Sequence, residues 1–229
     1  MNLALVGYGK MGRMIESLAA EYGGRVTLRL DEHNNARYEG ITRENFAGVD
    51  VAIDFSTPEA AAENIARIAA LGVNMVVGTT GWLDRMEEIR QTVARTGIGL
   101  VWSPNYSIGV QIFFRLAAEA ARLIAAHPAY EAWGYEIHHS AKKDAPSGTL
   151  LKLVEEMRRA GYDRRIDVAS NRAGTIAGTH EIGFDAAADT ITLRHTARNR
   201  EGFARGALHA ARWVAGKQGF YDFSQVLFG

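Results

Sequence analysis

A glycine-rich loop near the start of the chain limits most strongly what this sequence can fold into. It has the pattern GxGxxG and consists of Gly7, Tyr8, Gly9, Lys10, Met11 and Gly12. An apolar run, Leu3 to Val6, precedes it, and a helical pattern follows it. In this context the glycines allow a tight turn, a close approach of the backbone to a pyrophosphate, and close packing of the next helix. The sequence therefore predicts a dinucleotide-binding α/β domain in which these six residues bind the cofactor.

An acidic residue at the end of the next predicted strand supports this interpretation. Asp31 follows the apolar run Val26 to Leu30 and lies about 20 residues beyond the glycine loop, where a carboxylate binds the ribose hydroxyls of NAD. No arginine follows Asp31 directly, and Arg13 and Arg37 are the nearest guanidinium groups in the sequence. We expect NADH to be used well, and the use of NADPH stays open.

The first half of the chain alternates apolar runs with amphipathic helical stretches, which is typical of a parallel sheet with crossover helices. Thr57 and Pro58 form a start signal for a helix over Glu59 to Leu71, and Gly72 ends it. The predicted strands are Leu3 to Val6, Val26 to Leu30, Val49 to Phe55, Asn74 to Val77 and Ile98 to Trp102.

After Pro128 the pattern becomes rich in strands, so a second domain is predicted. Its strands are Trp133 to His139, Ile176 to Phe184 and Thr190 to Thr196, and the later helices are Ile108 to Ala126, about Thr149 to Ala160, and Glu201 to Gly216. The predicted fold class is α/β. A Rossmann-type parallel-sheet domain comprises residues 1–106 and 206–229, and residues 107–205 form an α+β domain on a mixed or antiparallel sheet.

Charge and cysteine content exclude several classes of protein. The 26 Lys and Arg residues balance the 26 Asp and Glu residues, so no net charge attracts the chain to nucleic acid or to an anionic membrane. No apolar stretch reaches the roughly 20 residues of a membrane-spanning helix, and the chain starts without a signal-peptide pattern. Zero cysteines exclude disulfides and cysteine nucleophiles. We expect a cytoplasmic protein that binds a small molecule.

Four further motifs carry a family resemblance. They are IDFSTP at positions 53–58, VGTTG at 77–81, PNYSIGV at 104–110 and HHSAKKDAPSGT at 138–149. Together these motifs resemble the dihydrodipicolinate reductase family, whose signature HHxxKxDAPSGT the last motif follows, with the expected acid before it at Glu136. The resemblance covers Gly7 to Leu227.

The resemblance implies an oxidoreductase that uses NADH, NADPH or both to reduce 4-hydroxy-tetrahydrodipicolinate in lysine and diaminopimelate biosynthesis, and that is usually a homotetramer. His138 and Lys142 match the catalytic positions. The implied substrate-binding residues are His139, Ser147, Gly148, Thr149 and Thr80. Besides the glycine loop and Asp31, the implied cofactor-binding residues are Phe55, Gly78, Thr79, Thr80, Ser103, Pro104, Asn105 and Tyr106.

The local chemistry agrees with these roles, although each part also has an ordinary structural explanation. An SGT sequence before a helix is most often a cap, and neighbouring lysines usually lie on a solvated surface. The complete motif favours function instead. A lysine ammonium beside a dianionic substrate offsets charge and donates a proton, so we interpret Lys142 as the proton donor and His138 as the residue that orients the substrate.

Several residues with potential for other chemistry are interpreted conservatively. No metal is expected, because adjacent His138 and His139 on a strand point to opposite faces and no HExxH or cysteine set accompanies them. A group of four downstream residues is interpreted as structural or interfacial: Arg172, Gly174, His180 and Arg194.

Two alternative functions remain open from the sequence. One is another two-domain amino-acid dehydrogenase, such as an aspartate dehydrogenase, which the HHxxKxDAPSGT string argues against. The other is a non-catalytic NAD(P)-sensing protein, which an NADH-oxidation assay distinguishes. Hydrolases and transferases are disfavoured, because the sequence contains no GxSxG motif and no P-loop.

Overall fold

The computed structural model describes all residues, 1–229, and the apolar runs of the first hundred residues form a parallel sheet. The strand order is β10-β5-β4-β3-β1-β2. The central strands are almost entirely buried, as expected for a parallel sheet that helices cover on both faces. The strands are β1 (Asn2–Val6), β2 (Arg25–Leu30), β3 (Val51–Asp54), β4 (Asn74–Val77), β5 (Gly99–Trp102) and β10 (Gly219–Asp222).

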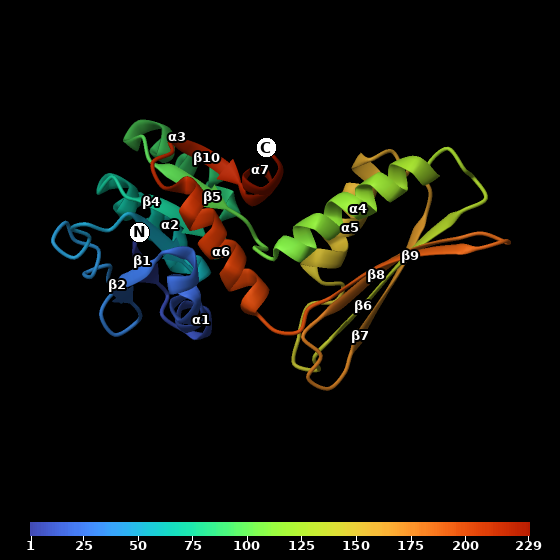
Figure 1. Cartoon of the computed structure of the whole chain (residues 1–229), viewed down its shortest axis with the longest axis horizontal. Coiled ribbons are helices and arrows are strands. Elements are labelled where there is room, and N and C mark those ends of the chain that lie inside the picture. The colour runs from blue at the N-terminus through green and yellow to red at the C-terminus, as the bar shows by residue number, and fades with distance from the viewer. The chain divides into compact units, whose positions relative to one another are not determined.

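Helices cover this sheet in two groups. From β1 the chain adds β2 on one side of β1, and then returns to add β3, β4 and β5 on the other side. Because crossovers are right-handed, the helix after β1 lies on one face of the sheet, and the helices after β3 and β4 lie on the other. On one face α1 (Lys10–Ala19) packs beside α6 (Glu201–Val214), and on the other α2 (Pro58–Ala70) packs beside α3 (Met86–Thr96) (Figure 1). The short helices η1 (Ala20–Tyr22), η2 (Leu83–Arg85) and α7 (Phe223–Phe228) complete the unit.

The second unit has two layers, with two helices on one face of a four-stranded sheet (Figure 1). Its strand order is β7-β6-β8-β9, in which β6 and β7 are parallel and the other pairs are antiparallel. The core lies between the sheet and the helices and includes Phe113, Met157 and Phe184. The elements are α4 (Ile108–Ile124), β6 (Glu131–His138), α5 (Gly148–Arg159), β7 (Ile166–Arg172), β8 (Thr179–Asp185) and β9 (Thr190–Thr196).

The chain returns from the second unit to the first at the start of α6. One unit contains Met1–Ser107 and Glu201–Gly229, and the other contains Ile108–Arg200. The sequence-based boundary after residue 205 was five residues too late, because the whole of α6 packs on α1 and on strands β3, β4 and β5. None of the helices combines the length and apolar character that crossing a membrane requires.

Most predicted elements are present, with shifts at their ends. The strand predicted from Val49 begins at Val51, the one predicted from Ile176 begins at Thr179, and the helix predicted to Ala126 ends at Ile124. Strands β7 and β10 were not predicted. β7 is almost entirely exposed, so it lacks the alternation of apolar and polar residues that marks a half-buried strand.

Substitution of Gly206 tests how closely α6 approaches the rest of its unit. A Cβ atom at Gly206 would lie 1.7 Å from the backbone oxygen of Tyr106. Gly206→Ala should therefore lower the free energy of unfolding by about 1–3 kcal/mol through overpacking, measured by urea denaturation. Gly202→Ala is the matched control, because its nearest neighbour would be the Ser107 Oγ atom at 3.5 Å. Equal stability of both variants would contradict this packing.

Candidate active site

The glycine loop joins β1 to α1, and its three glycines meet three different requirements. Gly7 has φ +89°, and a Cβ there would lie 2.3 Å from the backbone oxygen of Phe55. A Cβ at Gly12 would lie 2.8 Å from the backbone oxygen of Gly7, whereas Gly9, at the N-cap of α1, has open space around it. The loop therefore leaves room at its middle glycine, beside the free N–H groups of a helix N-terminus, which fits a pyrophosphate.

Tyr8 and Asp31 lie beside this loop. The backbone N–H groups of Gly7 and Tyr8 donate to the oxygen of Leu30 at the end of β2. The Tyr8 hydroxyl donates to Glu16, which also pairs with Arg29. Asp31 follows β2 directly, and its Oδ1 accepts from the N–H of His33 at 2.9 Å.

Arginines gather around Tyr8 in a way that the sequence did not indicate. The guanidinium groups of Arg13 and Arg29 each lie 5.8 Å from the centre of the Tyr8 ring. Arg29 was not considered from the sequence because it lies within β2, whereas the exposed Arg37 has no contact to this group. Besides Lys10 of the loop itself, the guanidinium groups of Arg13 and Arg29 are therefore the cationic groups beside Tyr8.

The loops after β3 and β4 are tied together by a buried carboxylate. Asp54 accepts hydrogen bonds from the Thr79 hydroxyl at 2.7 Å and from Asn64 at 3.0 Å. The hydroxyl of Thr79 consequently points into the protein, whereas Thr80 is exposed. A Cβ at Gly78 would lie 2.2 Å from the ring of Phe55, so these two predicted cofactor residues are in direct contact.

The segment from Ser103 to Tyr106 is held from within its own unit. The Tyr106 hydroxyl donates to the backbone oxygens of Val77 and Val101, and its ring packs on Phe55 and Phe223. Ser103 is buried and exchanges hydrogen bonds with the backbone of Asn105. Pro104 is exposed. Of this group, Pro104 and Asn105 present surface to a ligand, and Tyr106 is a core residue that positions the loop.

In the second unit, a fully buried carboxylate collects side chains from three strands and a helix. Glu136 on β6 accepts at Oε1 from the Ser147 N–H at 2.8 Å, from the Ser170 hydroxyl at 2.9 Å and from Arg172 at 2.9 Å. Although burial raises the pKa of Glu136, the hydrogen bonds from Ser147, Arg172 and Ser170 outweigh it and lower the pKa to about 2. Glu136 is therefore an anion at neutral pH.

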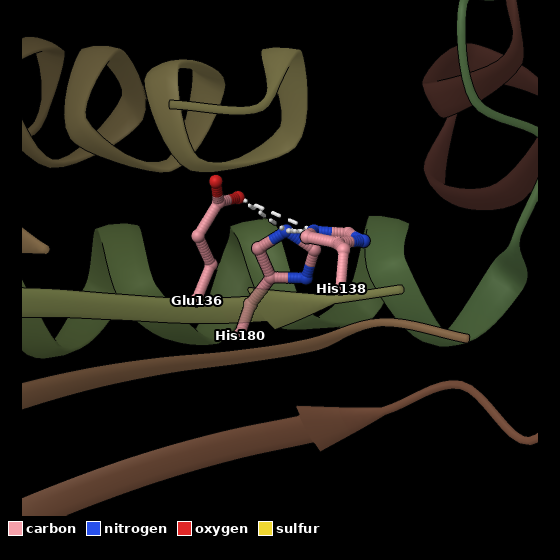
Figure 2. Close-up of side chains that lie close together, drawn as sticks. All are labelled: Glu136, His138 and His180. Carbon is pink, nitrogen blue, oxygen red and sulfur yellow. Dashed lines mark hydrogen bonds and ion pairs between the residues drawn. The ribbon is translucent and has the colours of Figure 1, made fainter. Parts of the chain in front are cut away.

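Two histidines face the other oxygen of this carboxylate (Figure 2). The Nε2 atoms of His138 and His180 each lie 3.3 Å from Oε2 of Glu136, and 3.3 Å from one another. Burial lowers the pKa of His138, and burial together with the charge of His138 lowers the pKa of His180 to about 4. Both rings are therefore neutral at pH 7.

The predicted catalytic lysine lies in the loop that leads to α5. Lys142 Nζ donates to Asp144 at 2.7 Å and 2.9 Å, and its side chain is 24% exposed. Lys143, its neighbour, is exposed, and His139 directly follows the last residue of β6 and is partly buried. Because the strand ends at His138, the opposite-face arrangement of His138 and His139 stays a prediction.

The start of α5 divides into a buried and an open part. Ser147 is the N-cap, and its hydroxyl accepts from the N–H of Leu150 and lies 3.1 Å from His180 Nε2. Gly148 is exposed, with no atom within 4 Å of the position that a Cβ would take, and Thr149 is partly exposed. A ligand thus has access to Gly148 and to part of Thr149, whereas Ser147 is buried.

Four residues of this cluster were missed or undervalued by the sequence analysis. Arg172 and His180 were interpreted as structural or interfacial, and Glu136 and Ser170 received no role. Alternation along β6 could have identified Glu136, because it shares a face with His138 two residues later. His180 is the cross-strand partner of Glu136 in β8, and this register could not be read from the sequence.

Two family models together match almost the whole chain, and the second of them includes α6, β10 and most of α7 besides the second unit. Residues 1–106 match the family described as dihydrodipicolinate reductase, N-terminus, and residues 109–227 match dihydrodipicolinate reductase, C-terminus. The chain belongs to the dihydrodipicolinate reductase family. This membership argues against the alternative of an aspartate dehydrogenase, and it agrees with the oxidoreductase and NAD(P)H assignments made from the motifs.

Individual relatives match almost the whole chain. A 4-hydroxy-tetrahydrodipicolinate reductase of Methanoregula boonei is 42% identical, over 95% of this chain and 92% of the relative. The reductase of Christiangramia forsetii is 33% identical, over 99% and 98%. Among solved structures, the dipicolinate-bound dihydrodipicolinate reductase of Paenisporosarcina sp. TG-14 has a TM-score of 0.78 at 21% identity, covering 98% of each chain. The predicted fold class is confirmed by this similarity.

Removal of Arg172 tests the buried carboxylate cluster. Arg172→Gln leaves the fully buried charge of Glu136 without its cationic partner, so the free energy of unfolding should fall by about 3 kcal/mol. Arg165→Gln is the matched control, because Arg165 pairs with Asp167 on the surface and its side chain is 84% exposed. Urea denaturation of both variants measures the difference. Equal stability of the Arg172 and Arg165 variants would show that the cluster does not need the guanidinium.

Proposed function

We propose that this chain reduces 4-hydroxy-tetrahydrodipicolinate to tetrahydrodipicolinate with NADH or NADPH, in lysine and diaminopimelate biosynthesis. The observation that carries the proposal is that Glu136 and Arg172 connect His138, the amino end of α5 and the loop that contains Lys142. The relative from Paenisporosarcina, which shares this fold, was solved with dipicolinate bound.

The first unit supplies the nucleotide-binding groups. When the nicotinamide cofactor is bound, it supplies the hydride. Gly9 and the start of α1 are proposed to hold its pyrophosphate, and Asp31 its ribose hydroxyls. The loop after β4, which contains Gly78 and Thr80, is proposed to hold the nicotinamide end of the cofactor. The buried Asp54 fixes the position of this loop through Thr79.

The second unit supplies groups that suit a dicarboxylate. The exposed N–H of Gly148 and the Thr149 side chain lie at a helix N-terminus, where unpaired N–H groups and the helix dipole favour an anion. Together with His139 they are proposed to bind a substrate carboxylate. Ser147 is proposed to hold this helix start in position, through its hydrogen bonds to Glu136 and His180.

Lys142 is proposed as the proton donor. Its ammonium group contacts Asp144 and is partly exposed, so the substrate carboxylate can replace Asp144 as its partner without uncovering a buried charge. His138 is proposed to orient the substrate and to assist proton transfer, because its ring is fixed by contacts to Glu136 and His180. The reaction then needs no covalent intermediate with the protein.

A direct assay tests the function. The substrate is generated by a dihydrodipicolinate synthase, and the oxidation of NADH and of NADPH is followed by absorbance in parallel. Turnover that requires the synthase product supports the reductase. Tight binding of NADH without any turnover would instead support the alternative of an NAD(P)-sensing protein.

Lys142→Ala tests the proton donor. It should lower kcat by about 100-fold or more, as expected for the loss of a general acid, while the Kd for NADH stays nearly unchanged. Lys143→Ala is the matched control, because Lys143 is exposed and does not fall on the lysine of the motif. A Lys142→Ala enzyme with normal kcat would contradict the assignment. A change in KM alone would reduce Lys142 to a carboxylate-binding charge.

We further propose that the protein works in the cytoplasm as a homotetramer. The sheet face opposite the helices supports self-association, because Trp133 and Tyr135 are only partly buried there and line an open depression together with Ala169. Apolar groups exposed together on one sheet face mark an interaction surface.

A further inference from the structure

Three side chains with metal-ligating atoms converge inside the second unit. Glu136 and His138 lie two residues apart on the same face of β6, and His180 is the register partner of Glu136 on β8. All three are buried, with exposed fractions of 0%, 7% and 4% respectively. One potential ligand atom of each lies within 4.8 Å of the other two. The cluster is therefore a feature of two paired strands.

The spacing of these atoms matches that around a small metal ion. Glu136 Oε2, His138 Nε2 and His180 Nε2 form a triangle with sides of 3.3 Å. Ligands at about 2.1 Å from a tetrahedral zinc ion lie about 3.4 Å from one another. Figure 2 shows the carboxylate oxygen and the two imidazole nitrogens directed toward a common point, and the ring centres are only 4.9 Å apart.

The carboxylate is oriented for such a role. Oε1 of Glu136 is occupied by three donors, whereas Oε2 is buried and has no hydrogen-bond partner. Buried polar atoms are normally paired, and the side chains that face Oε2 are the two imidazoles at 3.3 Å, so a cation between the three atoms would complete its pairing. Hydrogen bonds to the non-coordinating oxygen are typical of a carboxylate that binds a metal.

The ring of His138 is also fixed in position. A Cβ at Gly178 would lie 2.8 Å from Cε1 and 2.9 Å from Nδ1 of His138, so the backbone of Gly178 lies against the imidazole. Its φ of +148° is one that other residues rarely adopt. The glycine thus allows His138 to direct its Nε2 toward Glu136 and His180.

We propose that Glu136, His138 and His180 form a binding site for a divalent transition metal ion, with zinc as the best match. Two neutral imidazoles and one carboxylate are ligands that zinc prefers, and three protein ligands leave an open coordination position. Arg172 on Oε1 weakens the attraction for a dication, so the metal is removable by a chelator. The pairing of His138 and His139 considered from the sequence is not involved.

The bound metal inhibits the reductase, and this second part rests on the proposed function. The ligand atom of His138 is Nε2, and a metal bound there would hold the imidazole that is proposed to orient the substrate. The metal and the reaction therefore compete for the same imidazole. The substrate-free enzyme should bind zinc, and an excess of chelator should restore full activity.

Isothermal titration of the full chain with zinc chloride, after removal of metals with a chelator, tests binding. One zinc ion per chain is expected, and His180→Gln should weaken binding by about 100-fold or more, which exceeds the usual effect of a residue that only supports a ligand. His127→Gln is the matched control, because His127 is exposed and lies outside the cluster. The absence of stoichiometric binding, or equal affinity of both variants, would overturn the site.

NMR on the unaltered chain keeps the test decisive if His180→Gln does not fold. One equivalent of zinc should shift the ring-proton resonances of His138 and His180 and leave those of His33 and His127 in place. Shifts confined to the exposed histidines would overturn the proposal as adventitious binding. If zinc binds at the cluster without reducing turnover, the inhibitory part is wrong. A chain without any reductase activity would instead refute the proposed function, while the titration still decides the metal site.

Discussion

The architecture of the second unit depends on one buried anion, the carboxylate of Glu136. Removing a charge from water is costly unless the protein supplies compensating groups. Here the Ser147 N–H, the Ser170 hydroxyl and the Arg172 guanidinium compensate at one oxygen. These donors come from α5 and β7, so the carboxylate joins the start of the helix to two strands. The same residue then directs its second oxygen at His138 and His180.

This arrangement explains why the loop with Lys142 lies where it does. Arg172 also donates to the backbone oxygen of Asp144, and Lys142 pairs with the Asp144 side chain. A chain of contacts therefore connects the buried anion to the proposed proton donor. In the first unit a second buried carboxylate, Asp54, has a similar function, because it holds the loops after β3 and β4 through Ser56 and Thr79.

Much of the fold could be predicted from the sequence because its signals are local. The strand before the glycine loop, the proline at the start of α2 and the glycines that end helices all act through neighbouring residues. Strand β7 could not be predicted, since its inward face starts with Ile166 and Val168 but continues with the polar residues Ser170 and Arg172. The domain boundary at Glu201 also depends on tertiary packing, because only the contacts of α6 assign residues 201–205 to the first unit.

The candidate site also contains residues that the sequence could identify and residues that it could not. The motif that contains His138, Lys142 and Gly148 is contiguous and could be recognised directly. His180 and Arg172 lie more than 30 residues from Glu136 in the sequence. Their positions depend on the register of β6 with β7 and β8, which a single sequence does not encode in any local pattern. Burial of the Tyr106 side chain is likewise a result of tertiary packing, because its ring lies against Phe55 and Phe223.

The most direct measurement is the activity of Glu136→Gln, a variant of nearly equal shape that removes only the charge. If the buried anion assembles the substrate site, kcat/KM for the substrate should fall by about 100-fold or more, while the Kd for NADH changes less than about twofold. Circular dichroism confirms that the variant is folded. A folded variant with the kcat/KM of the unaltered chain would contradict the account.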